Sequence, residues 1–82
     1  MDLIALTKEL VTSVVKNKEE VIVKEFPTEE ENFILIKVMV NADDMGSVIG
    51  KEGKIANAIR TLVQASGYIN GNKKVKINID SF

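Results

Sequence analysis

The chain has 82 residues, of which 45% are hydrophobic and 28% charged, so it is long enough for one small folded domain and too short for two. It contains no cysteine and no histidine, which excludes disulfides, thiolate chemistry and the commonest general base. The formal net charge is -1, but residues 1–42 carry five lysines against eight acids (net -3), whereas residues 43–82 carry six basic residues against four acids (net +2). No apolar run is long enough to span a membrane and the acidic, amphipathic start does not resemble a signal peptide, so we expect a cytoplasmic protein without a membrane partner.

The first half of the chain predicts one helix and a β-hairpin. Apolar residues recur at helical spacing over Leu3–Lys16, and Asp2 precedes them as a plausible N-cap. A β-branched strand over Glu20–Phe26 is stopped by Pro27 and by a polar, acidic loop. The strand Phe33–Val40 follows, and its nearly continuous apolar run is typical of a central strand.

The second half predicts two helices and a last strand. Asn41 caps a short helix that ends at Gly50, with two aspartates in its first turn. A longer amphipathic helix begins near Gly53, and we expect Gly67 to end it as a C′ residue. After an Asn-Gly turn, residues 74–80 alternate between apolar and polar side chains as a half-buried strand does. The order is therefore helix, strand, strand, helix, helix, strand.

The stretch between the two later helices, GSVIGKEGK, has the glycine content of a phosphate-binding loop. A P-loop ending at Gly50 would need glycine where the chain has Met45 and a hydroxyl residue where it has Glu52, and the dinucleotide fingerprint needs a first glycine pair that is absent. What remains is Gly50-Lys51-Glu52-Gly53 between two helices. This is the Gly-x-x-Gly pattern of a KH module, which clamps about four nucleotides.

The chemistry of that stretch suits a nucleic-acid backbone. Glycine accepts tight-turn backbone angles and allows a sugar-phosphate chain to come close, and the free amides at the start of the second helix favour a phosphate. Lysines beside the loop add full charges, apolar side chains on the two helices supply a floor for bases, and backbone groups of the last strand can meet base edges. The candidate RNA-binding residues are Gly50, Lys51, Glu52, Gly53, Lys54, Val48, Ile49, Ile55, Arg60 and Ile77, with Ile59 as a further floor residue.

The run VIGKEGKIANAIRTLVQA, with NADDMG shortly before it, resembles the small bacterial single-domain KH RNA-binding proteins called KhpA. The resemblance covers nearly the whole chain, and it implies an α+β type II KH fold over residues 1–82, with a three-stranded sheet packed against three helices on one face. It also implies single-stranded RNA as the partner, a role as a post-transcriptional regulator or RNA chaperone, and a homodimer or a heterodimer with a larger KhpB/Jag-type protein. No catalysis, cofactor or metal is expected.

Two residues depart from the general KH pattern, and other interpretations stay open. Ala56 stands where a large apolar residue is usual, although KhpA-like sequences share this shift, and Glu52 places an acid inside the loop, which predicts weak, salt-sensitive binding. The glycines are also compatible with an ordinary helix-helix turn, and the basic residues with a solvated helix face. The main alternative is a protein-interaction module, suggested by the slightly acidic total and by apolar Leu35 and Met39, which we expect to be exposed.

Overall fold

The computed structural model describes residues 2–82, which form the six expected elements and three short 3-10 turns. The elements are α1 (Leu3–Thr12), η1 (Lys18–Glu20), β1 (Ile22–Pro27), β2 (Phe33–Val40), η2 (Ala42–Asp44), α2 (Met45–Ile49), η3 (Lys51–Gly53), α3 (Lys54–Ile69) and β3 (Lys74–Ser81). The expected boundaries of β2 match the structure. β1 begins two residues later than expected because Lys18–Glu20 forms a 3-10 turn, and it includes Pro27, which was expected to stop it. Within residues 2–82, no helix is long and apolar enough to cross a membrane.

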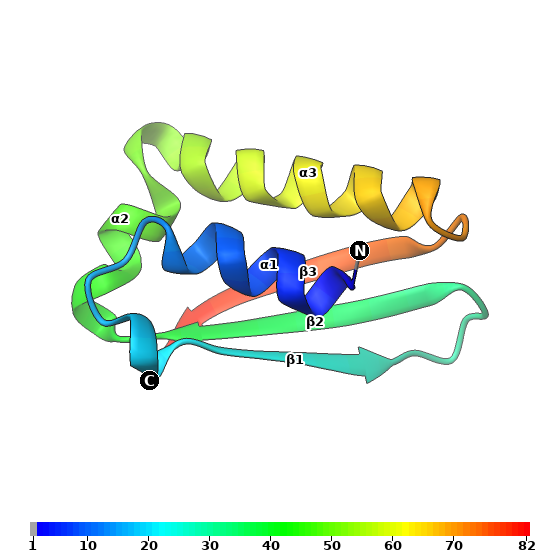
Figure 1. The fold of residues 1–82 in the computed structure, drawn as a ribbon, viewed down its shortest axis with the longest axis horizontal. Helices are drawn as coiled ribbons and strands as arrows, with labels where there is room; N and C mark the ends of the chain where they lie inside the picture. The colour runs from blue at the N-terminus through cyan, green and yellow to red at the C-terminus, as the bar shows by residue number, and fades with distance from the viewer. Residues whose placement is uncertain (1) are drawn as a thin grey trace.

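The three strands form one mixed sheet in the order β1-β2-β3. β1 and β2 pair as the antiparallel hairpin predicted from the sequence, whereas β2 and β3 are parallel. A parallel pair needs a crossover connection, and the segment containing α2 and α3 supplies it. The helices lie on one side of the sheet and leave its other face uncovered (Figure 1). The expected α+β fold, with a three-stranded sheet and three helices, is confirmed.

The core fills the space between the covered face of the sheet and the helices. Alternate residues of β2 point into it: Ile36, Val38 and Val40 are fully buried. The register sets Ile36 beside Ile77 of β3, and α1 and α3 contribute further buried valines to the same cluster. The alternation with period two places the intervening residues of each strand on the uncovered face.

The first helix is shorter than predicted because its last turn is used for other bonds. α1 ends at Thr12, and the Ser13 hydroxyl donates to the carbonyl of Leu10 at 2.6 Å. The backbone N–H groups of Lys16 and Asn17, which a longer helix would have used internally, donate instead to the carboxylate of Asp44. The expected helical end at Lys16 is therefore wrong.

Gly67 does not end the long helix, contrary to the prediction. α3 continues to Ile69, and Gly67 is buried within it. A methyl group at this position would come within 2.7 Å of Val75 Cγ2 and 3.2 Å of the Lys73 carbonyl oxygen. The glycine is therefore needed for close approach of α3 to β3, and the turn after the helix uses Gly71 and Asn72 at positive φ.

Candidate nucleic-acid interface

The loop between α2 and α3 turns the chain sharply at Gly50 and again at Gly53. Gly50 adopts φ 73° and ψ 179°, and its N–H donates to Gly46 O at 2.9 Å, closing α2. Gly53 adopts φ 76° and ψ 10°, and its N–H donates to Gly50 O at 3.3 Å. Both conformations lie in the region that L side chains avoid, which explains glycine at these two positions.

The two glycines have different environments. A methyl group on Gly50 would lie 2.8 Å from Ile55 Cβ and still closer to Ile55 Cγ1, so the first turn of α3 packs directly on this residue. A methyl group on Gly53 would have only Asn57 Nδ2, at 3.8 Å, within 4 Å. Gly50 is therefore required by packing and by backbone angle, whereas Gly53 is required by backbone angle alone.

Glu52 also has a left-handed backbone conformation, with φ 57° and ψ 26°. A non-glycine residue pays a strain of order 1–3 kcal/mol there, and such strain is concentrated at functional sites. The Glu52 side chain is exposed, as are those of Lys51 and Lys54 on either side of it. The loop therefore presents two cations and one carboxylate to solvent.

The start of α3 adds a partial positive charge beside these lysines. The residue that precedes the helix, Gly53, makes no side-chain capping bond to its first amides. A helix of 16 residues has a macrodipole whose positive end lies here. The N–H of Lys54 is already used by the carbonyl of Lys51, so the helix dipole and the two lysines are what suit an anion such as a phosphate here.

The apolar floor is smaller than predicted. Ile49 and Ile55 have exposed fractions of 40% and 37%, so a ligand can contact both of them. Val48 is fully buried and Ile59 and Ile77 are 4% exposed, because their side chains point into the core. The expectation that the Val48 and Ile59 side chains line a groove is corrected by this burial, and the Ile77 side chain also stays within the core.

Arg60 does not lie with the loop lysines but reaches across to the edge of β3. Its Nε donates to the carbonyl oxygen of Ile77 at 3.4 Å, and Nη1 donates to Asn57 Oδ1 at 3.3 Å. One turn further along α3, Gln64 Nε2 donates to the carbonyl oxygen of Val75 at 3.2 Å. These bonds use two acceptors of the β3 edge that faces the helix.

Asn57 and Gln64 were not among the residues predicted from the sequence. With Arg60 they follow the spacing i, i+3 and i+7, which places them along one side of a helix. That polar stripe was visible in the sequence, but only the structure shows that it faces the β3 edge.

The comparisons with known proteins agree with this geometry. The family model for the KH domain of KhpA and KhpB matches residues 5–79. The chain belongs to this family of KH domains. The protein named RNA-binding protein KhpA from Oceanobacillus iheyensis is 44% identical over 75 residues, covering 92% of this chain and 96% of that protein. Its namesake from Listeria monocytogenes is 43% identical, with coverage of 88% and 96%, and that from Clostridium perfringens is 45% identical, with coverage of 90% and 95%.

Two solved structures share the fold of this KH domain at low sequence identity. A variant of Aquifex aeolicus Era bound to GDP.AlF4- superposes with a TM-score of 0.72 at 15% identity and covers 98% of this chain. Era in complex with MgGDPNP and nucleotides 1506–1542 of 16S ribosomal RNA superposes with a TM-score of 0.67 at 16% identity and covers 96% of this chain. The chain spans only 30% and 29% of these two Era chains, and the likeness concerns the fold alone.

Within the KH domain, a buried carboxylate at the end of η2 anchors the start of α2. Asp44 Oδ1 accepts from the N–H of Lys16 at 3.0 Å, and Oδ2 accepts from the N–H and the side-chain amide of Asn17, both at 3.1 Å. The bond from the Lys16 amide has the largest effect on the pKa of Asp44, and it lowers that pKa. Burial of the carboxylate has the next largest effect and raises the pKa, and the bonds from Asn17 lower it further. The sequence interpretation of Asp44 as a first-turn aspartate thus missed its main contact, which joins the end of α1 to the helix before the loop.

Proposed function

We propose that this KH domain binds single-stranded RNA, with the sugar-phosphate chain against Gly50–Gly53 and the bases over the groove between the two loop helices and the edge of β3. The observation that carries the proposal is the bare, positive-φ backbone at both glycines, beside the N-terminal end of α3 and two exposed lysines. The relatives named RNA-binding protein KhpA, similar over nearly their full length, support RNA as the ligand class.

Each part of the groove has a distinct task in this proposal. Lys51 and Lys54 neutralise phosphates beside the positive end of the α3 dipole, while Ile49 and Ile55 offer apolar surface to the bases. At the β3 edge, an incoming base competes with Arg60 for the Ile77 carbonyl, so the guanidinium is released to stack on the base or to contact a phosphate.

The affinity of a single groove is expected to be modest and sensitive to salt. Two lysine-phosphate contacts to a single strand give a slope of about -1.4 in log K against log salt concentration. Glu52 reduces the local positive charge further because its carboxylate is exposed in the same loop. We therefore expect measurable binding at low salt and much weaker binding at physiological salt.

The test is a titration of a labelled random pool of short single-stranded RNA, about five nucleotides long, at two salt concentrations. The variant Lys51→Asp with Glu52→Asp leaves both glycines in place, and aspartate tolerates the left-handed conformation at position 52. The matched control is Lys8→Asp with Glu9→Asp, which makes the same charge change at an exposed lysine-glutamate pair on α1.

We expect the loop variant to bind about tenfold more weakly than wild type and its salt slope to fall to about -0.7, because Lys54 remains, while the α1 control binds like wild type. Circular dichroism checks that both variants are folded. Equal binding by the loop variant and wild type would show that the loop is not the RNA site. Absence of binding by wild type at low salt would reject the RNA function itself.

We also propose self-association, or pairing with a larger KH protein of the KhpB/Jag type, through the outer face of α3. Apolar residues at 58, 62, 65 and 69 follow the spacing of a coiled-coil seam. Leu62 and Ile69 are 53% and 78% exposed, which is unusual for two large apolar side chains on one stripe. Sedimentation across a dilution series tests this: Leu62→Lys should lower the mass of the species formed, and a wild-type monomer at every concentration would exclude self-association.

A further inference from the structure

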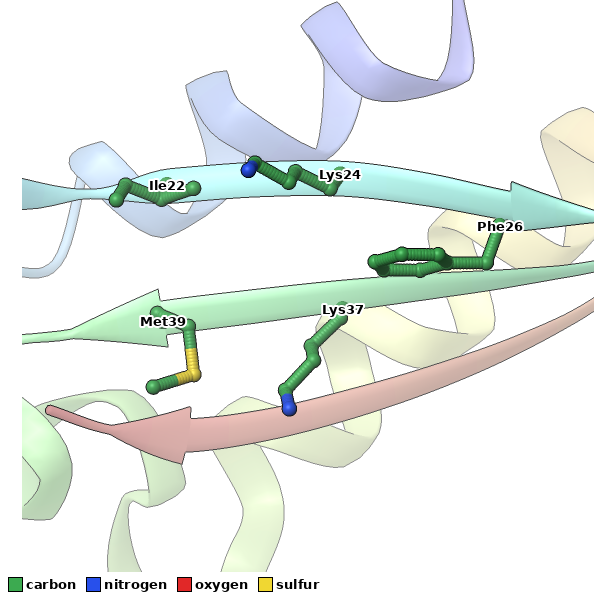
Figure 2. Close-up of a pocket in the computed structure, with 5 residues that line it drawn as sticks. All are labelled: Ile22, Lys24, Phe26, Lys37 and Met39. Atoms are coloured by element: carbon green, nitrogen blue, oxygen red, sulfur yellow. The ribbon is translucent and has the colours of Figure 1, made fainter.

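The face of the sheet that no helix covers has its own pattern of side chains. The strand registers set Ile22 opposite Met39, and Lys24 opposite Lys37, on neighbouring strands. Phe26 lies opposite Leu35 in the next row towards the hairpin. Figure 2 shows five of these side chains in front of the sheet, with the helices behind it. The uncovered face is therefore a mixture of apolar side chains and lysines.

Lysines outnumber acids on the strands of this face. Lys24 and Lys37 are exposed and directly opposite each other, an arrangement that destabilises a strand pair. β3 adds the exposed lysines 74 and 76 to the same face. The one acid that β3 places on this face is Asp80, which lies near the end of the strand, beside Met39. An anion bound between these two lysines would offset their repulsion.

Apolar surface is exposed between these charges. Phe26 and Ile22 are 42% and 41% exposed, although both are large and apolar. With Lys24, Lys37 and Met39 they line a shallow hollow of about 220 Å³, and the Phe26 ring extends from β1 into the space between the first two strands (Figure 2). The hollow thus combines an accessible aromatic ring with two amino groups.

We propose that this uncovered sheet face is a second contact surface for single-stranded nucleic acid, with one base against the Phe26 ring and the neighbouring phosphates on Lys24 and Lys37. Aromatic side chains interleaved with cations are the usual means by which a sheet holds single strands, because every base has a face to stack and every nucleotide has a phosphate to neutralise. An acidic peptide would satisfy the lysines but would make no specific use of the ring.

The position of β3 connects the two surfaces, and the inference therefore rests on the proposed function. One edge of β3 faces the groove through Arg60 and Gln64, while its lysines 74 and 76 point to the uncovered face. An RNA chain that leaves the groove and crosses β3 first meets Lys76. Lys76 is in register with Leu35 of β2, which is in turn opposite Phe26 of β1, so the RNA then reaches these two apolar side chains. A longer RNA can thus contact both surfaces at once, whereas an RNA that fills only the groove cannot.

The test compares two labelled random pools of single-stranded RNA, of about five and about fifteen nucleotides. The variant Lys37→Glu places an acid opposite Lys24, so it removes the like-charge pair and should leave the fold as stable as wild type or more so. The control Lys8→Glu makes the same charge change on the exposed surface of α1. A second variant, Phe26→Leu, keeps an apolar side chain but removes the ring.

We expect Lys37→Glu to weaken binding of the long pool about tenfold and to leave the short pool unchanged, with no fall in melting temperature. Phe26→Leu should weaken the long pool by about fivefold or more and spare the short pool. If Lys37→Glu and Lys8→Glu lost equal affinity for the long pool, the effect would come from overall charge. If Lys37→Glu lost equal affinity for the long and short pools, the effect would come from the groove. Either result overturns the inference.

Two further results separate this inference from the proposed function. If wild type binds the short pool and Lys37→Glu binds the long pool as well as wild type does, the groove remains the RNA site and the second surface is rejected. A labelled polyglutamate peptide tests the other occupant: if wild type binds it, Lys37→Glu does not, and the long pool is unaffected, the face binds an acidic protein and the inference is wrong. If wild type binds neither pool, both proposals fail.

Discussion

Replacing Gly50 by alanine should destabilise the domain far more than the same change at Gly53. At Gly50 the added methyl group meets the first turn of α3, with Ile55 Cβ at 2.8 Å, and the backbone keeps a positive φ. Strain of about 1–3 kcal/mol for the backbone and about 1–3 kcal/mol for overpacking give a total loss of roughly 2–6 kcal/mol. At Gly53 only the left-handed conformation counts, at about 1–2 kcal/mol.

The assay is urea unfolding, monitored by circular dichroism. Provided that the m-value, the dependence of the unfolding free energy on urea, is the same, the midpoints of the two single variants and wild type are compared. The double variant Gly50→Ala with Ile55→Ala removes the atom nearest to the new methyl group, Ile55 Cγ1, so it should lose less stability than the sum of its single changes, by about 1 kcal/mol. If Gly50→Ala were no more destabilising than Gly53→Ala, the packing of Ile55 on Gly50 would not be what requires the glycine. Strict additivity in the double variant would show that the Ile55 side chain beyond Cβ takes no part in the clash.

Three further predictions concern the scaffold. Gly46→Ala should stabilise the domain by about 0.5–1 kcal/mol in urea unfolding, because a methyl group there has nothing within 4 Å and the residue is helical. Gly67→Ala should cost about 1–3 kcal/mol in the same assay, since its methyl group would lie 2.7 Å from Val75 Cγ2. The lowered pKa of Asp44 means that its contribution to stability is complete above about pH 4, the unfolded value, and is lost as the pH falls below it. Melting temperatures of Asp44→Ala should therefore depend less on pH than those of wild type between about pH 5 and pH 2, and parallel curves would refute this linkage.

The sequence predicted those features of the fold that depend on neighbouring residues. The apolar run of β2 and the alternation in β3 indicated their strands and their buried faces, and the structure buries Val75 and Ile77 as expected. The loop was predictable for the same reason, since a tight turn between two helices limits the residue types that fit. Positive φ at Gly50 and Gly53 confirms that local reasoning.

Features that depend on contacts between distant segments were missed. Asp44 looked like a helix-capping aspartate, but its three bonds go to residues 16 and 17, which are 27 or 28 positions away. Gly67 looked like a helix terminator, but the close approach of β3 explains it. Val48 was placed at the candidate groove because it adjoins the loop, although its spacing is also that of a core residue, and the packed structure shows that it is fully buried.

β3 lies between the proposed groove and the uncovered face, and its position bears on how a domain with a net charge of -1 could bind a polyanion. The acids that lower the total lie mainly in the first half of the chain, with three of them in the exposed hairpin loop at positions 29–31. The lysines of the second half lie instead around the loop, in the turn before β3 and on β3, so the net charge conceals a local excess of basic residues near this strand. Because the loop also carries the carboxylate of Glu52, cations on β3 and on the uncovered face would compensate for what the groove lacks, and longer RNA should gain affinity that the groove alone does not provide.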